Sequence, residues 1–157
     1  MSYANSICQK VQLSCRDMLR AASSAGTLTL LPAAAVLAGI ETGSVPLPRV
    51  VCLCKRAVAE EIFDGNWSAD ATVRVLAAGA ELTEAEFHAL AGEVFAHFFL
   101  ASETVAANWS SADNEFTALA VYPRTQEWEL VDDGSGNGAL WAAELTLTVK
   151  CCGSVIS

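Results

Sequence analysis

The sequence predicts an α+β fold, in which a mainly antiparallel sheet packs against an N-terminal helix and a central amphipathic helix. Three observations support this class: a helical hydrophobic stripe near the start, a capped helix in the middle, and alternating strands in the last third. The chain has 157 residues, 53% of them hydrophobic, which suits one domain with its own core. No repeat interrupts the pattern, so we expect residues 1–157 to form a single α+β domain.

The first predicted element is an amphipathic helix over residues 5–22. Its apolar side chains recur at helical spacing, at Ile7, Val11, Cys15 and Met18. Gly26 suits the left-handed conformation that commonly ends a helix. Beyond it, Thr27–Leu31 is predicted to be a short strand, and the alanine-rich stretch that follows has no single preference.

Two further strands are predicted in the segment after the proline-rich lead-in. Arg49–Arg56 alternates, which places Arg56 on the same face as Val50, Cys52 and Cys54. The turn residues Asp64-Gly65-Asn66 lead into a second alternating run, Ala69–Ala78. We expect these two strands to pair antiparallel across the intervening loop.

The central helix is predicted from Thr83 to about Leu100. Thr83 and Glu86 form a capping box, in which a hydroxyl and a carboxylate each accept from an exposed amide. A full apolar stripe follows, made of Phe87, Leu90, Ala91, Val94, Phe95 and Phe98.

The last third is predicted to be β-structure. Phe116–Tyr122 ends at a proline, and Glu127–Val131 alternates around Trp128 and Leu130. A glycine-rich acidic loop then precedes a long strand, Leu140–Lys150. Leu145, Leu147 and Val149 share one face of that strand, so we expect this face to be buried.

The charge is unevenly divided along the chain. Its net value of −9 excludes a general nucleic-acid binder, which needs a basic surface. Residues 1–56 carry six basic and two acidic side chains, a balance of +4, whereas residues 57–157 carry three basic and sixteen acidic ones, a balance of −13. Such asymmetry indicates an oriented partner, which can be a second copy of the chain, and an uneven but unimportant surface is the open alternative.

Six cysteines are spread over the chain without a C-x-x-C motif. A chain of this length needs no disulfide framework, so we expect free, mostly buried thiols in a reducing cytoplasm. The alternative is a secreted protein with disulfide bonds, which six reactive thiols in the denatured chain would exclude. We expect no zinc site and no cofactor, because neither His88 nor His97 lies near a pair of cysteines in the sequence. We expect no membrane span, because the longest apolar run has only thirteen residues, 28–40.

No catalytic arrangement is recognisable, and we expect the protein not to be an enzyme. His88 and His97 are nine positions apart on one helix and so point to opposite sides of it, about 180° apart, which means that they cannot serve one site. His97 can meet Glu93, which lies four residues before it. The adjacent carboxylates Glu60-Glu61 and Asp132-Asp133 are typical of solvated clusters. A competing hypothesis is a small cytoplasmic enzyme or ligand-binding domain that uses the tryptophan-bearing sheet.

The order of motifs resembles neck proteins of tailed bacteriophages, over about residues 46–152. The resemblance rests on three segments, LPRVVCLCKRAVAEEIFDGNWSADATVRV, LTEAEFHALAGEVFAHF and QEWELVDDGSGNGALWAAELTLTVKCC. The class it resembles most is the tail terminator, also called the tail completion or head–tail joining protein. The resemblance implies a structural virion protein that forms a ring, commonly a hexamer, which ends the tail tube and joins it to the neck. Connector and tube proteins are the alternatives within this group.

The resemblance also implies partners and surfaces. Partners would be other copies of the chain, the tail tube protein and neck or connector proteins, assembled in the host cytoplasm, while DNA passes through the lumen without specific binding. A head-to-tail ring needs two complementary surfaces, for which the candidates are Arg49, Lys55, Arg56, Glu60 and Glu61. An acidic lumen would repel passing DNA, and its candidates are Asp64, Asp132 and Asp133, with Glu60 and Glu61 beside them.

Overall fold

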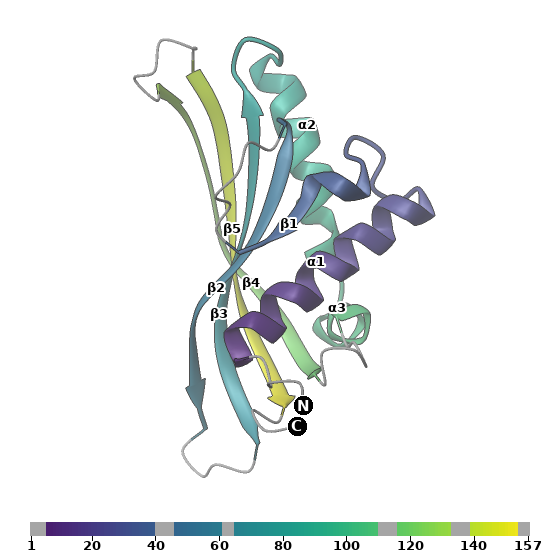
Figure 1. Cartoon of the computed structure of the whole chain (residues 1–157), viewed down its shortest axis with the longest axis vertical. Coiled ribbons are helices and arrows are strands. Elements are labelled where there is room, and N and C mark those ends of the chain that lie inside the picture. Colours follow the sequence, from purple (N-terminus) through teal and green to yellow (C-terminus); the bar gives the residue numbers. More distant parts are fainter. Residues whose placement is uncertain (1–5, 40–45, 61–64, 110–115, 133–138, 154–157) are drawn as a thin grey trace.

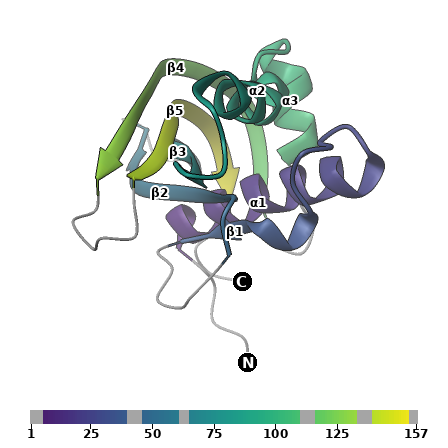
Figure 2. The same cartoon turned by 90° about the horizontal axis from the view of Figure 1, so that it is seen from above.

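The computed structural model describes residues 6–39, 46–60, 65–109, 116–132 and 139–153. These residues form the predicted α+β fold, a mostly antiparallel five-stranded sheet with the order β1-β2-β3-β5-β4. The strands are β1 (Val36–Ala38), β2 (Arg49–Ala59), β3 (Asn66–Ala78), β4 (Phe116–Asp132) and β5 (Ala139–Gly153). The helices α1 (Ile7–Ala25), α2 (Glu84–Phe95) and α3 (Ser102–Trp109) cover one face of the curved sheet (Figures 1 and 2). We call the other face the open face.

The N-terminal helix is confirmed, and it ends three residues later than predicted. Ser6 caps its start, because the Ser6 hydroxyl accepts from the backbone N–H of Gln9 at 3.2 Å. Gly26 has a φ of 84°, the left-handed conformation expected of this cap. The predicted apolar stripe is buried against the sheet.

The predicted strand Thr27–Leu31 is wrong, because these residues form bends without strand pairing. The backbone N–H groups of Thr29 and Leu30 donate to the Glu93 carboxylate instead of to a neighbouring strand. The alanine-rich stretch forms a short 3-10 helix, η1 (Ala33–Ala35), and then β1. β1 pairs in parallel with only Val50, Val51 and Cys52 of β2.

The β2–β3 pair is antiparallel as predicted, but the face assigned to Arg56 is wrong. The register of the pair shifts between Cys54 and Arg56, which leaves Lys55 in a bulge. Beyond the bulge the alternation is reversed, so Arg56 stands beside Asp70 on the open face, while Cys54 stands beside the buried Ala71.

The central helix begins with the predicted capping box, in which Thr83 and Glu86 exchange hydrogen bonds of 3.1 and 3.2 Å. The α-helix ends at Phe95, earlier than predicted, and continues as a 3-10 helix, η2 (Ala96–Phe98). This tighter turn brings Phe98 into the core, where its ring meets the Trp109 ring edge-on at 6.0 Å. Trp109 belongs to α3, a helix that the sequence pattern did not predict.

The two strands predicted before the acidic loop are one strand, β4. Register shifts at Leu119 and at Arg124 let the pairing with β5 continue past Pro123. A proline is tolerated there because β4 is an edge strand. β5 includes the predicted Leu140–Lys150 and lies between β3 and β4, paired with β3 from Asn66 to Ala78.

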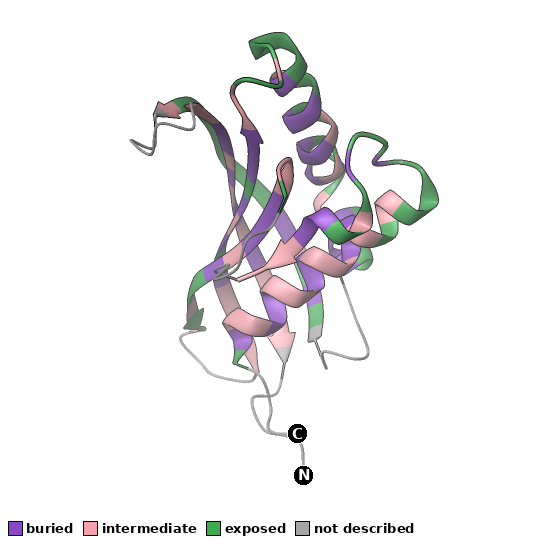
Figure 3. Cartoon of the chain, turned by 45° about the horizontal axis from the view of Figure 1, so that its top comes forward, coloured by how far each residue is buried: buried purple, intermediate pink, exposed green. Residues whose placement is uncertain are grey.

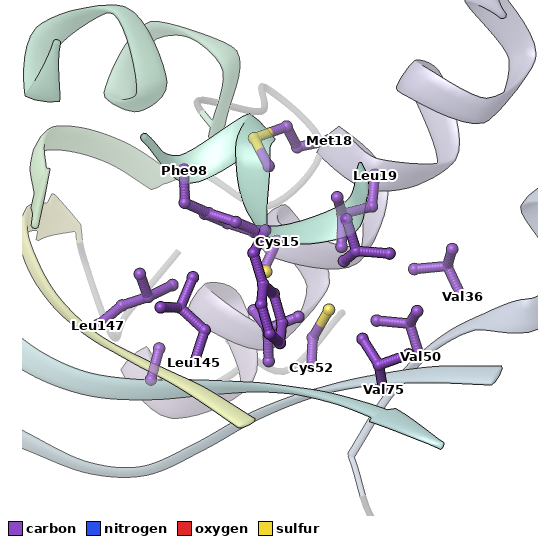
Figure 4. Packing of buried hydrophobic residues seen from close by; sticks show 14 of the residues in the cluster. Cys15, Met18, Leu19, Val36, Val50, Cys52, Val75, Phe98, Leu145 and Leu147 are labelled. Atoms are coloured by element: carbon purple, nitrogen blue, oxygen red, sulfur yellow. The ribbon is translucent and has the colours of Figure 1, made fainter. Parts of the chain in front are cut away.

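The core lies between the helices and the sheet (Figure 4). It includes Cys15, Met18 and Leu19 from α1, Phe98 from η2, and the sheet residues Val36, Val50, Cys52, Val75, Leu145 and Leu147. The predicted buried face of β5 is therefore confirmed. Among the described residues, no helix has both the length and the apolar character needed to cross a bilayer.

Candidate functional site

The basic candidates Arg49, Lys55 and Arg56 all lie on β2. Arg49 is half-buried at the start of the strand, whereas Lys55 and Arg56 are exposed near its far end. The structure therefore brings Lys55 and Arg56 together and separates them from Arg49. Neither Lys55 nor Arg56 forms an ion pair with another described side chain.

The acidic candidates are only partly described. Glu60 follows β2, and its carboxylate lies 3.4 Å from the Lys150 ammonium, with both side chains about 43% exposed. Such an exposed pair contributes little to stability. Glu61, Asp64 and Asp133 lie outside the described residues, as does the side chain of Asp132 at the end of β4.

The open face carries polar groups that pair across the strands. Arg74 of β3 forms an ion pair with Glu144 of β5. On the neighbouring pair of strands, the Thr125 backbone N–H donates to the Thr146 hydroxyl at 3.1 Å. Each of these four groups therefore has its partner within the sheet.

The second half of β4 is different, because every residue from Tyr122 to Leu130 is exposed (Figure 3). We call this stretch the β4 arm. Side chains of a strand alternate between two faces, so nine consecutive exposed residues mean that neither face is fully covered. Trp128 is 47% exposed and Leu130 is 50% exposed, on the helix side of the sheet. Glu127 and Glu129 point to the open face and form no ion pair with described residues.

Trp128 is held by other aromatic rings. The His88 ring meets it edge-on at 4.6 Å, and the Trp141 ring lies 5.9 Å away. Trp141 is itself stacked on the buried Phe87, and its indole N–H donates to the Leu82 carbonyl at 3.1 Å. One face of Trp128 is therefore fixed by α2 and β5, while the rest of the indole remains uncovered.

A hollow of about 290 Å³ lies beside the β4 arm. It is lined by Arg74, Glu127, Trp128, Glu129, Ala142 and Glu144. The ligand-binding hypothesis would be favoured by a deep pocket that combines a tryptophan with a histidine. This hollow has the tryptophan, but neither His88 nor His97 lines it.

The two histidines lie in separate environments. The His88 ring nitrogen lies 3.7 Å from the Glu84 carboxylate. His97 does meet Glu93, as the helical spacing allows, but its Nδ1 lies 3.0 Å from the Glu93 backbone carbonyl and it forms no close ion pair with the carboxylate. Glu93 uses its carboxylate to hold the turn at Thr29 and Leu30. Burial opposes its ionisation, but those hydrogen bonds, helped by the nearby His97, outweigh burial and lower the pKa of Glu93.

All six cysteines are free thiols, and Cys15, Cys52, Cys54 and Cys151 are buried. Burial raises the pKa of Cys15, and a hydrogen bond with Cys52 adds to the effect (Figure 4). Burial likewise raises the pKa of Cys151 to about 12. No group of histidine, cysteine or carboxylate side chains in the described ranges is placed to hold a metal ion.

Sequence reasoning did not select the β4 arm. The alternation Glu127-Trp128-Glu129-Leu130 predicted a strand with one apolar face, and the structure confirms that strand. The sequence alternation is the same whether helices of this chain or a second chain cover the apolar face of the strand. The sequence shows that glutamates flank Trp128, but it does not show that β4 is an edge strand.

No family model matches the chain, and no curated protein matches its sequence. Among solved structures, the fold is similar to a chain of the "Virion of native gene transfer agent (GTA) particle". The TM-score is 0.62 at 16% sequence identity, and the alignment covers 91% of this chain and 95% of that chain. The likeness extends over nearly the whole of both chains and shows a shared fold.

Proposed function

We propose that this chain is a structural protein of a phage-like virion, and that it forms a ring at the head–tail junction. The observation that carries the proposal is the shared fold with a virion chain, which extends over 91% of this chain and 95% of the other. The motif order that resembles tail terminators supports the finer assignment. In this role the ring ends the growing tail tube and joins it to the neck of the head.

The charge distribution supports an oriented assembly. A closed head-to-tail ring needs two different surfaces on each copy, because one surface of each copy binds the other surface of its neighbour. Exposed basic side chains lie on the far half of β2, and exposed acidic ones lie on β4, at the opposite edge of the sheet. The proposed partners are other copies in a hexamer, the tail tube protein and the neck or connector proteins.

DNA would pass through the ring without specific binding. The proposal keeps Asp64, Asp132 and Asp133 as the acidic residues that line the lumen. A lumen of the same sign as the phosphate backbone repels DNA and prevents adhesion. Glu60 is a weaker candidate than the sequence suggested, because Lys150 stands 3.4 Å from its carboxylate.

Deletion of the gene from the genome that encodes the particle tests this role. Without a terminator, tubes grow to uncontrolled lengths and do not join heads, so electron micrographs should show long tubes beside separate heads. The wild-type chain supplied from a plasmid should restore joined particles of uniform tail length.

The same experiment separates the alternatives. A connector would leave tails of normal length that fail to join heads, and a tube protein would leave no tails at all. Normally joined particles in the deletion strain would contradict every virion role and favour a ligand-binding or enzymatic domain.

A further inference from the structure

The sheet has two free edges that face away from each other. β4 is the last strand on one side, so the β4 arm pairs with β5 alone. On the other side, β1 covers only Val50–Cys52 of β2, and the Cys54 backbone N–H donates to the Gln12 side chain of α1 at 2.9 Å. No described strand pairs with that edge from Leu53 to Ala59. We call Leu53–Ala59 the β2 tail. Free edges present unpaired backbone N–H and C=O groups, which can accept another strand.

The charges on these two edges are opposite and unpaired. Lys55 and Arg56 are exposed on the β2 tail, whereas on the β4 arm the exposed Glu127 and Glu129 outnumber its one exposed base, Arg124. Neither the two bases of the β2 tail nor these two glutamates form an ion pair within the described part of the chain. Glu127 stands directly opposite Glu144, which already binds Arg74, and like charges placed in this way are unfavourable. A cation from outside the chain would relieve this repulsion.

The side chains would also match face by face. Adding a strand continues the two faces of a sheet, so residues of the open face meet residues of the open face. Glu127 and Glu129 lie on the open face of the β4 arm, and Arg56 lies on the open face of the β2 tail. On the helix side, the half-exposed Trp128 and Leu130 would meet the small side chains of the β2 tail, Ala57 and Ala59.

Resting on the proposed function, we propose that the β4 arm of one copy adds to the β2 tail of the next copy. Main-chain hydrogen bonds join the two edges, and Glu127 and Glu129 pair with Lys55 and Arg56. The two surfaces differ, so each contact leaves one surface of each kind free. Association therefore continues from copy to copy until the assembly closes.

Charge reversal tests this contact in the full-length chain. One variant carries Glu127→Lys with Glu129→Lys, and the other carries Lys55→Glu with Arg56→Glu. Each should associate about a hundredfold more weakly than the wild type, because each brings like charges together. Light scattering coupled to size exclusion measures the association, and circular dichroism checks that each variant is folded.

Mixing the two variants is the decisive step. The lysine-bearing β4 arm of one variant then faces the glutamate-bearing β2 tail of the other, and the reverse contact joins two surfaces that are unchanged. An equimolar mixture should therefore assemble although neither variant does so alone. The control is Glu81→Lys with Glu103→Lys, which changes the net charge equally at exposed sites away from both surfaces and should leave association unchanged.

Hydrogen exchange provides a second measurement. The backbone amides of Thr125–Val131 that point away from β5 should become protected when the wild type assembles. Assembly without this protection, a mixture that stays unassembled, or a wild type that remains monomeric at its highest soluble concentration would overturn the proposal. If the mixture does not assemble but the deletion strain shows long tubes beside separate heads, this contact is refuted and the virion role stands. Joined particles in the deletion strain refute the virion role itself.

Discussion

Glu93 shows how one side chain joins segments that are distant in sequence. Its carboxylate accepts hydrogen bonds from the Thr29 hydroxyl at 2.7 Å and from the Leu30 backbone N–H at 2.8 Å. It thereby holds the turn between α1 and β1 against α2. Helical spacing indicates that Glu93 can meet His97, but it does not indicate that Thr29 and Leu30, which lie before α2 in the sequence, supply the hydrogen-bond donors for the carboxylate.

Replacement of this carboxylate should weaken the fold in a pH-dependent way. Glu93→Gln should lower the free energy of unfolding by about 1 kcal/mol at pH 7, a low value for charged hydrogen bonds because the site is partly exposed. The pKa of Glu93 is lowered in the folded chain, so its contribution is present above the ordinary value of 4.5 and is lost as the pH falls through the folded value. Urea unfolding from pH 7 to pH 3 should show the two chains converging in acid. Equal stability at pH 7 would contradict this role, and Glu103→Gln is the exposed control.

The thiols should differ in reactivity according to burial. Alkylation proceeds through the thiolate, so Cys15, Cys54 and Cys151, whose pKa values are raised chiefly by burial, should react slowly in the folded chain. The half-buried Cys8 and Cys152 should react first. Mass spectrometry after iodoacetamide treatment at pH 8 measures the order. Uniform labelling of the folded chain would contradict the buried positions, and fewer than six reactive thiols in denaturant would favour the secreted alternative.

Individual elements were predictable where their determinants are local. The start of α2 depends on Thr83 and Glu86, which are three residues apart, and both hydrogen bonds of the box form. Distant contacts decide the remainder. The bulge at Lys55 reverses the face of Arg56, and pairing with β5 carries β4 past Pro123. α3 has a weak stripe of its own and packs on β4.

The candidate site also has one part that local sequence predicts and one part that depends on distant contacts. Lys55 and Arg56 could be selected from the sequence because charge is visible there, and both are exposed. The β4 arm could not be selected, because its exposure depends on where the helices stop covering the sheet. Periodicity indicates that Trp128 and Leu130 share a face but does not indicate what covers that face.

The two neighbouring tryptophans should separate folding from assembly. Trp141→Ala should lower the free energy of unfolding by about 3–5 kcal/mol, because Trp141 is only 7% exposed and stacks on Phe87. Trp128→Ala should cost only about 1 kcal/mol, the worth of its aromatic contacts, because 47% of it is exposed. Denaturant unfolding of the dispersed chains measures both values. Equal costs would mean that the β4 arm is an integral part of the monomer core.

At the scale of the whole molecule, the basic first part and the acidic second part of the sequence contribute charged residues to opposite sides of the sheet. Two exposed bases without an ion pair to a described side chain, Lys55 and Arg56, lie on β2. The exposed Glu127 and Glu129 lie on β4, where they outnumber the one exposed base of the β4 arm, Arg124, and β3 and β5 lie between the two strands. The chain is thus polarised across its sheet as well as acidic overall. A molecule with opposite charges on opposite edges favours association in one direction.

Association should accordingly weaken with salt. Raising the ionic strength from about 0.1 M to 1 M shortens the screening length from about 10 Å to 3 Å, which reduces the attraction between exposed charges. Sedimentation of the wild-type chain over this range should show smaller assemblies at high salt. Assemblies that grow with salt would indicate an apolar contact centred on Trp128 and Leu130.

The position of the chain in an assembled particle tests the proposed role most directly. An epitope tag on the chain, detected with gold-labelled antibody in electron micrographs of assembled particles, locates it directly. The account predicts one cluster of gold at the junction of head and tail in each particle. Gold spread along the tail, or particles without gold while the tagged chain stays unassembled, would contradict it.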